Sequence, residues 1–117
     1  MLKRANYLLF TLLLCCTTIA SLPEEPKPPI IQTLKSLTKY EAQLSEYVMY
    51  LVTFLAKTKV KVNDPNYPEY TYPDLSTLKD EHSITAVKYN INILLEYIKK
   101  TQPIAKKVYN QYSKLKM

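Results

Sequence analysis

The sequence predicts an all-α protein, an antiparallel helical hairpin of two long helices at about residues 29–60 and 75–115. Apolar residues recur every three or four positions in both ranges, which is the helical period. The chain has 8 prolines and no glycine, and most of the prolines lie outside or at the edges of these ranges. A short apolar–polar alternation near residues 58–62 has no obvious partner strand. Together these observations favour helices joined by proline-fixed connections.

Residues 1–20, MLKRANYLLFTLLLCCTTIA, have the build of a secretory signal peptide. Two basic residues precede an apolar core of about ten residues, which is half of what a membrane span needs. Thr18 and Ala20 are the small residues expected before a cut after Ala20. Such a cut removes Cys15 and Cys16, both cysteines of the chain, and leaves a domain without disulfides.

Two alternatives remain for this N-terminal segment. It is an uncleaved anchor, or it belongs to a bacterial lipoprotein, because a cysteine follows the apolar run. The lipoprotein alternative is weakened at Cys15, since Leu14 stands where a lipoprotein cleavage site has a small residue.

Residues 21–29, SLPEEPKPP, predict an extended arm of polyproline type. The last proline, Pro29, is suited to the first position of a helix. Residues 30–117 then form a single helical domain.

The first helix is predicted from one wide apolar face. A stripe and a neighbouring aromatic row share the helical period: Ile30, Leu34, Leu37, Leu44, Val48, Leu51, Leu55, with Tyr40, Tyr47, Phe54. Glu41 interrupts the stripe. We interpret it as a residue that sets the register of packing or reaches a lysine, and a functional carboxyl in a pocket is the alternative.

The Pro/Tyr loop at residues 63–74, NDPNYPEYTYPD, separates the helices, since its prolines bar a helix. Tyr67, Tyr70 and Tyr72 are candidate binding residues, because aromatic side chains offer contact area at low entropic cost. They are also candidate sulfation acceptors beside acids. The alternative is a loop that folds down over the open end of the helix bundle.

The second helix is predicted to start between Asp74 and Thr77, where several residues suit an N-cap. Its apolar stripe is Ile84, Val87, Ile91, Leu94, Ile98, and the phase resumes after Pro103. The helix is therefore kinked or broken at Pro103, and the continuous phase favours the kink. A lone hairpin leaves part of each wide apolar face exposed to solvent. We therefore expect a three-helix fold or a homodimer that forms a four-helix bundle.

The composition argues against an enzyme. Without glycine there is no phosphate-binding loop or dinucleotide fingerprint, and no cofactor is expected. The single histidine, His82, allows one imidazole base and no histidine cluster for a metal, and we interpret it as an exposed helix residue.

The C-terminal helix is basic and amphipathic. Between residues 99 and 117 the chain has six lysines and no acid: Lys99, Lys100, Lys106, Lys107, Lys114, Lys116. This face suits an anionic membrane or an acidic partner, or is simply a solvated helix surface. Nucleic acid is not expected, since the chain is predicted to be secreted and has no nucleic-acid-binding motif.

These features predict a small secreted, extracellular protein that acts as a binding or effector protein on another extracellular protein. The alternative is a secreted helical protein that acts on membranes through its lysines or carries a lipid or other apolar ligand along its apolar stripe.

Overall fold

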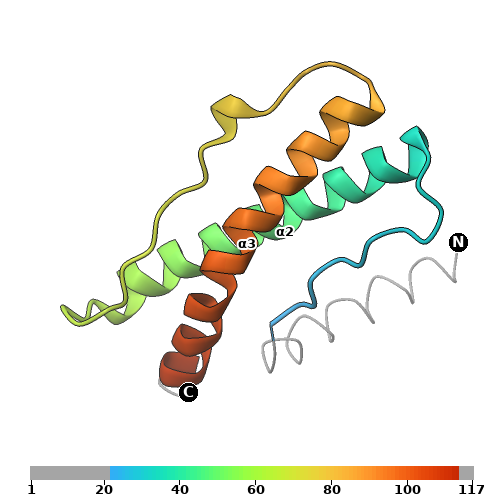
Figure 1. Ribbon diagram of the computed structural model, residues 1–117. Coiled ribbons are helices and arrows are strands. Elements are labelled where there is room, and N and C mark those ends of the chain that lie inside the picture. The colour runs from blue at the N-terminus through green and yellow to red at the C-terminus, as the bar shows by residue number, and fades with distance from the viewer. Residues whose placement is uncertain (1–21, 114–117) are drawn as a thin grey trace, which may run out of the picture.

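The computed structural model describes residues 22–113, and Figure 1 shows their arrangement. Helix α2 spans Leu34–Val62, the short 3₁₀ helix η2 spans Leu75–Thr77 and helix α3 spans Ile84–Tyr112. There is no strand among these residues. The predicted all-α fold of two long packed helices is confirmed. The predicted signal peptide, Lys114 and Lys116 lie outside the described residues.

The two helices run in the same direction. Glu41, near the start of α2, bonds to Asn90 near the start of α3, and Phe54 packs on Tyr109 near their ends. The antiparallel orientation expected from the sequence is therefore corrected. The connection, residues 63–83, is about 20 residues long, and an extended chain of that length easily returns along a 29-residue helix of about 43 Å.

Helix α2 begins later than Pro29 because a capping box sets its start. The Thr33 hydroxyl accepts a hydrogen bond from the Ser36 backbone N–H at 3.0 Å, and the Ser36 hydroxyl accepts one from the Thr33 N–H at 2.9 Å. The arm therefore extends to Thr33. Ile30, expected on the buried stripe, is 98% exposed.

The C-cap of helix α2 is Asn63, directly after Val62. Asn63 has left-handed backbone angles, φ 47° and ψ 50°. Its N–H donates to the Lys59 carbonyl at 3.0 Å. Glycine commonly occupies this position, and asparagine is the residue that replaces it at least cost. The glycine-free chain thus ends its first long helix with Asn63.

Helix α3 begins at Ile84, about nine residues after the expected start. Asp74 does act as an N-cap, but of η2, where its carboxylate accepts from the Ser76 N–H at 3.1 Å. The cap of α3 is Ser83, whose hydroxyl accepts from the Ala86 N–H at 3.2 Å. The predicted loop at 63–74 is thus only the first part of a longer connection.

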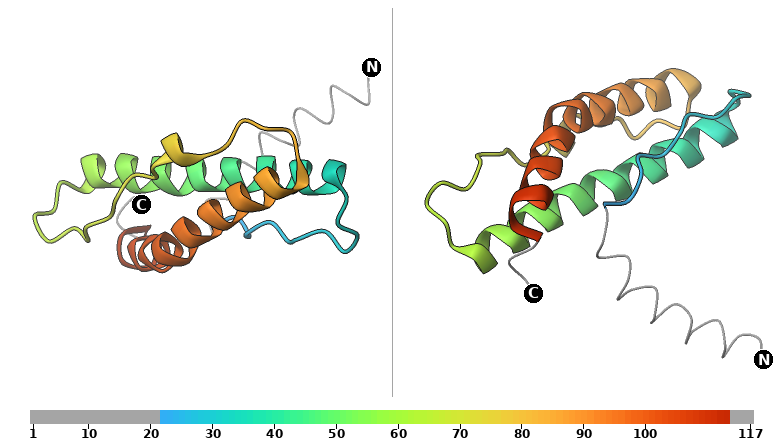
Figure 2. Two further views of the ribbon diagram at one scale, coloured as in Figure 1. Left: turned by 45° about the horizontal axis from the view of Figure 1, so that its top comes forward. Right: turned by 90° about the horizontal axis from the view of Figure 1, so that it is seen from below.

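Helix α3 continues through Pro103, so the expected kink is confirmed and the expected break is not. Figure 2 shows the helix changing direction in its last third. Proline causes such bends because it lacks the N–H of the helical bond and crowds the preceding turn. A packed third helix does not occur in residues 22–113, where η2 is the only further helical element.

The core lies between α2, α3 and the two segments that pack on them. It contains most of the predicted stripes and one connection tyrosine: Leu37, Tyr40, Leu44, Tyr47, Val48, Leu51, Leu55, Tyr67, Val87, Ile91, Leu94, Tyr97, Ile98, Ala105, Val108, Tyr112. Leu22 of the arm packs against this cluster. The apolar stripe is thereby used in core packing. The connection and the arm lie on opposite sides of the helix pair (Figures 1 and 2).

Candidate functional site

The connection is fixed to the helices by one buried amide. Asn90 is 2% exposed, and its Oδ1 accepts from the Lys79 N–H at 2.8 Å. Its Nδ2 donates to the Lys79 carbonyl and to Glu41 Oε2, both at 2.9 Å. Asn90 of α3 therefore joins the connection to α2.

Asn90 was missed by the reasoning from sequence, whereas Glu41 was noticed. A signal was present, because Asn90 stands three residues after Val87 and four before Leu94, within the apolar stripe. A polar residue in such a stripe is buried and needs partners. Glu41 provides one of them.

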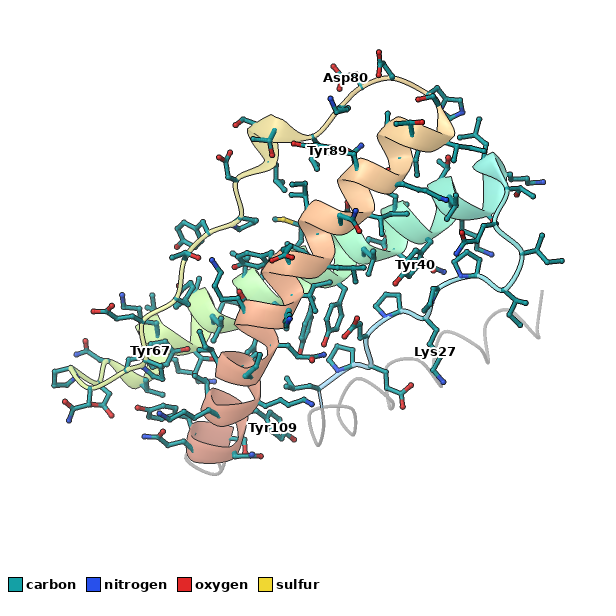
Figure 3. The ribbon with its side chains drawn as sticks, viewed as in Figure 1. Lys27, Tyr40, Tyr67, Asp80, Tyr89 and Tyr109 are labelled. Atoms are coloured by element: carbon teal, nitrogen blue, oxygen red, sulfur yellow. The ribbon has the colours of Figure 1, made fainter. Side chains whose placement is uncertain are left out.

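Tyr67 lies in the core. It is 8% exposed, its hydroxyl donates to the Leu55 carbonyl at 2.8 Å, and its ring lies 5.6 Å from that of Tyr112. Burial, with smaller effects from Tyr70 and Tyr112, raises the pKa of Tyr67 to about 12. Figure 3 shows Tyr67 where the connection leaves α2. Its side chain is part of the fold and is covered from partners.

The other two candidate tyrosines lie farther out. Tyr70 is half-buried and meets Tyr72 edge-on at 5.7 Å between ring centroids. Burial, and then the hydrogen bond with Tyr72, raises the pKa of Tyr70 to about 12. Tyr72 is 66% exposed, and Leu75 beside it is 43% exposed. Of the three predicted binding residues and sulfation acceptors, Tyr72 is the one presented to solvent.

Hydrogen bonds from α3 hold the connection at Thr71, next to Tyr72, and at its start. The Tyr97 hydroxyl donates to the Thr71 carbonyl at 2.6 Å, and the Tyr112 hydroxyl donates to Asp64 at 2.8 Å. The pKa of Asp64 is lowered, first by the hydrogen bond from the Asn66 backbone N–H and then by that from Tyr112. With the Asn90 contact, the connection is a fixed surface.

This surface is acidic. Residues 63–83 contain five acids and one lysine: Asp64, Glu69, Asp74, Asp80, Glu81, Lys79. The pKa of Asp74 is lowered by hydrogen bonds from the Ser76 side chain and backbone, which stabilise its charged form. We call Tyr72, Leu75 and these acids the acidic platform. His82 is exposed beside it, as expected, but it lies in the connection and not in a helix.

The described lysines of the C-terminal half of α3 share one face. Lys99, Lys100, Lys106 and Lys107 are all exposed. At 100° per residue they fall within an arc of about 120°, opposite the buried side of the helix. We call these four lysines the basic face.

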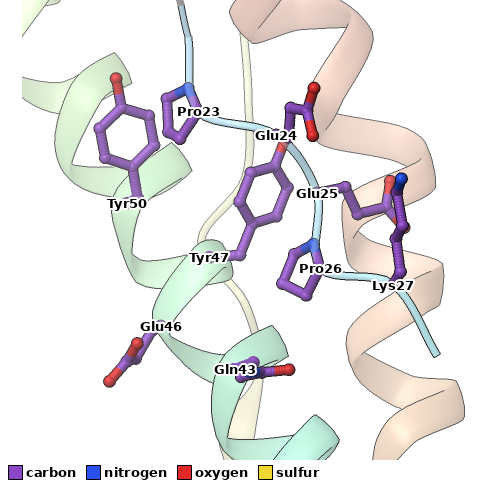
Figure 4. Close-up of a pocket in the computed structure, with 9 residues that line it drawn as sticks. All are labelled: Pro23, Glu24, Glu25, Pro26, Lys27, Gln43, Glu46, Tyr47 and Tyr50. Atoms are coloured by element: carbon purple, nitrogen blue, oxygen red, sulfur yellow. The ribbon is translucent and has the colours of Figure 1, made fainter. Parts of the chain in front are cut away.

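A shallow groove of about 790 Å³ lies between the arm and α2 (Figure 4). It is lined by Pro23, Glu24, Glu25, Pro26, Lys27, Gln43, Glu46, Tyr47, Tyr50. Gln102 of α3 contacts two of these residues, since its Nε2 donates to the Tyr47 hydroxyl at 2.7 Å and to Glu25 at 3.3 Å. The sequence predicted an extended arm but contained no signal that the arm runs back along α2.

Within residues 22–113, neither long helix is apolar enough to cross a membrane. Residues 21–114 match the Borrelia orf-D family. The chain is also 56% identical over 99 residues to the outer membrane lipoprotein BBA14 of Borreliella burgdorferi, an alignment that covers 85% of this chain and 82% of that protein. The family match thus takes in the arm, both helices and the connection, and the chain belongs to the Borrelia orf-D family.

Proposed function

We propose that this chain is a lipoprotein anchored at the outer membrane surface, which binds an extracellular protein and is not an enzyme. The observation that carries the proposal is the acidic platform, a fixed surface with an exposed aromatic ring, on the side of the helix pair opposite the arm. The name of the similar protein, an outer membrane lipoprotein, supports the anchoring.

The proposed lipid attachment site is Cys16. Relative to Cys16, Leu13 is at position −3 and the small Cys15 is at −1, which suits a lipoprotein cleavage site better than the sequence before Cys15 does. Cleavage there keeps one cysteine, whereas the cut after Ala20 removes both. The mass of the N-terminal peptide of the protein isolated from cell membranes distinguishes cleavage before Cys16 from cleavage after Ala20. We also expect Cys16→Ala to abolish acylation and Cys15→Ala to retain it.

An anchor at this end of the chain places the acidic platform away from the membrane. The arm leads back to the anchor, and the connection lies across the helix pair from the arm. Figure 3 shows this separation in the positions of Lys27 on the arm and Asp80 on the connection. The platform therefore faces the surroundings of the cell.

The chemistry of the platform indicates the kind of partner it fits. Tyr72 and Leu75 offer an apolar anchor, and the surrounding acids favour a partner with basic residues around an apolar pocket. The backbone carbonyl of Thr71 is already held by Tyr97. Binding therefore orders little additional chain, which lowers its entropic cost.

The test is a panel of immobilised extracellular proteins probed with three forms of the chain. These are the wild type, a Tyr72→Ser/Leu75→Ser double variant and a Met49→Ser/Val60→Ser control that removes two exposed apolar residues from α2. A partner consistent with the proposal binds the wild type and the control, loses at least tenfold in affinity with the platform variant, and binds more weakly at high salt. If every partner binds the platform variant as tightly as the wild type, the platform is not the recognition surface.

A further inference from the structure

We propose that the basic face of α3 docks on anionic lipid headgroups of the membrane in which the chain is anchored. This inference rests on the proposed lipid anchor for its geometry. It adds a second membrane contact, through protein side chains, and it sets the orientation of the acidic platform.

The arm meets α3 beside the basic face. Glu25 of the arm accepts a hydrogen bond from Gln102. Lys99 and Lys106 stand three residues before and four residues after Gln102, so both are its neighbours on the helix surface. The chain segment that leads to the anchor thus lies at the edge of the basic face.

The number of residues between the arm and Cys16 limits the distance between the folded domain and the membrane. Leu22 packs on the core, and Cys16 stands six positions before it in the chain. Six extended residues span about 20 Å at most. A lipid on Cys16 would therefore keep the membrane within about 20 Å of Leu22.

The charge of this region matches an anionic surface. Residues 97–113 contain the four lysines and no acid, and Glu96, four residues before Lys100, is the one acid of α3. Each lysine close to an anionic membrane contributes about a fivefold increase in partition. The acidic platform, across the helix pair from the arm, is repelled by the same surface. Attraction and repulsion therefore favour the same orientation, with the basic face toward the lipid.

The first experiment uses the full acylated chain reconstituted in vesicles. Lysines are acetylated with a water-soluble reagent and the modified positions are read by mass spectrometry. In vesicles with 30% phosphatidylglycerol, we expect at least threefold slower acetylation of the basic face than in pure phosphatidylcholine. Lys57 and Lys59 of α2, which are exposed, are the internal control and should react equally in both. Equal labelling of the basic face in both vesicles would overturn the proposal.

The second experiment removes the anchor and keeps the folded part. The core and the family match both lie within residues 21–114, so residues 21–117 contain the whole packed unit, and circular dichroism verifies its helices. Its binding to the same two vesicle types is measured by co-sedimentation. Neutralising the basic face by four Lys→Gln substitutions should weaken binding to anionic vesicles at least tenfold. Neutralising Lys35, Lys39, Lys57 and Lys59 makes the same charge change on α2 and should weaken it less than threefold.

The outcomes separate this inference from the proposed anchor. Equal losses in the two quadruple variants would show attraction by net charge alone, and absence of binding to anionic vesicles would show that the face has no affinity for lipid. Either result overturns the docking while acylation of Cys16 still stands. A mature chain found to begin at Ser21, without a lipid, removes the anchor. The vesicle binding of residues 21–117 then still reports on the basic face.

Discussion

Replacing Asn90 by alanine should destabilise the protein more than replacing any other polar residue of α3 by alanine. The side chain is 2% exposed and makes three hydrogen bonds of 2.8–2.9 Å, two to the backbone of Lys79 and one to Glu41. Each such bond contributes about 1 kcal/mol net, so we expect a loss of about 3 kcal/mol. For a domain of this size that lowers the Tm by roughly 12–24 °C.

The assay is urea unfolding followed by circular dichroism at 222 nm, with Asn92→Ala as the control. Asn92 is exposed on the same helix, and its replacement should change stability by less than about 0.5 kcal/mol. Hydrogen exchange should also accelerate at the Lys79 amide, which loses its acceptor. If Asn90→Ala and Asn92→Ala have the same stability within error, Asn90 does not hold the connection to the helices, and the fixed acidic platform loses its main support.

Three further predictions test the tyrosine core and the helix ends. Because the pKa of Tyr67 is raised to about 12, its stabilising effect is complete below pH 10 and is lost as the pH rises toward 12. Tyr67→Phe should therefore cost about 1 kcal/mol at pH 7, through the lost bond to Leu55, and flatten the fall in stability between pH 10 and 12 in urea titrations. Asn63→Ala should cost about 1 kcal/mol and Asn63→Gly almost nothing, since the left-handed backbone disfavours a β-carbon; equal losses would contradict the cap. Ser83→Ala should lower the Tm through a loss of about 1 kcal/mol, and Ser76→Ala, which removes only a hydroxyl bond to Asp74, should cost less than half of that. The reverse order would restore the earlier helix start.

The periodicity of the sequence predicted both long helices and most of their buried residues, but it could not predict their relative direction. A stripe of apolar residues on a helix packs equally well in either direction. The direction depends on the length of the connection, and that length was underestimated because Asp74 is a genuine cap, of a three-residue 3₁₀ helix. Local signals also placed the start of α2 too early, where Ile30 continues the apolar period but the Thr33 capping box begins the helix.

The candidate site was predictable only where exposure follows from helical phase. The phase of α3 opposite its apolar stripe placed the four described lysines on one exposed face, and the structure has them there. The connection has no period, so nothing in the sequence distinguishes the buried Tyr67 from the exposed Tyr72. That difference arises from tertiary contacts, since the Tyr67 hydroxyl reaches a carbonyl of α2 twelve residues earlier.

The direction of the helices and the proposed orientation on the membrane are linked. Had α3 run antiparallel to α2, a short turn would have sufficed, and the acids of residues 63–83 would have gathered at one end of the molecule. With both helices in the same direction, the connection must travel the length of α2, and it does so on the side that the arm leaves open. The long return therefore spreads an acidic surface along one side, while the arm, with Lys99 and Lys106 beside its contact at Gln102, occupies the other. An anchored molecule with acids on one side and lysines beside the arm on the other has one favourable orientation on an anionic membrane. In that orientation Tyr72 faces away from the lipid.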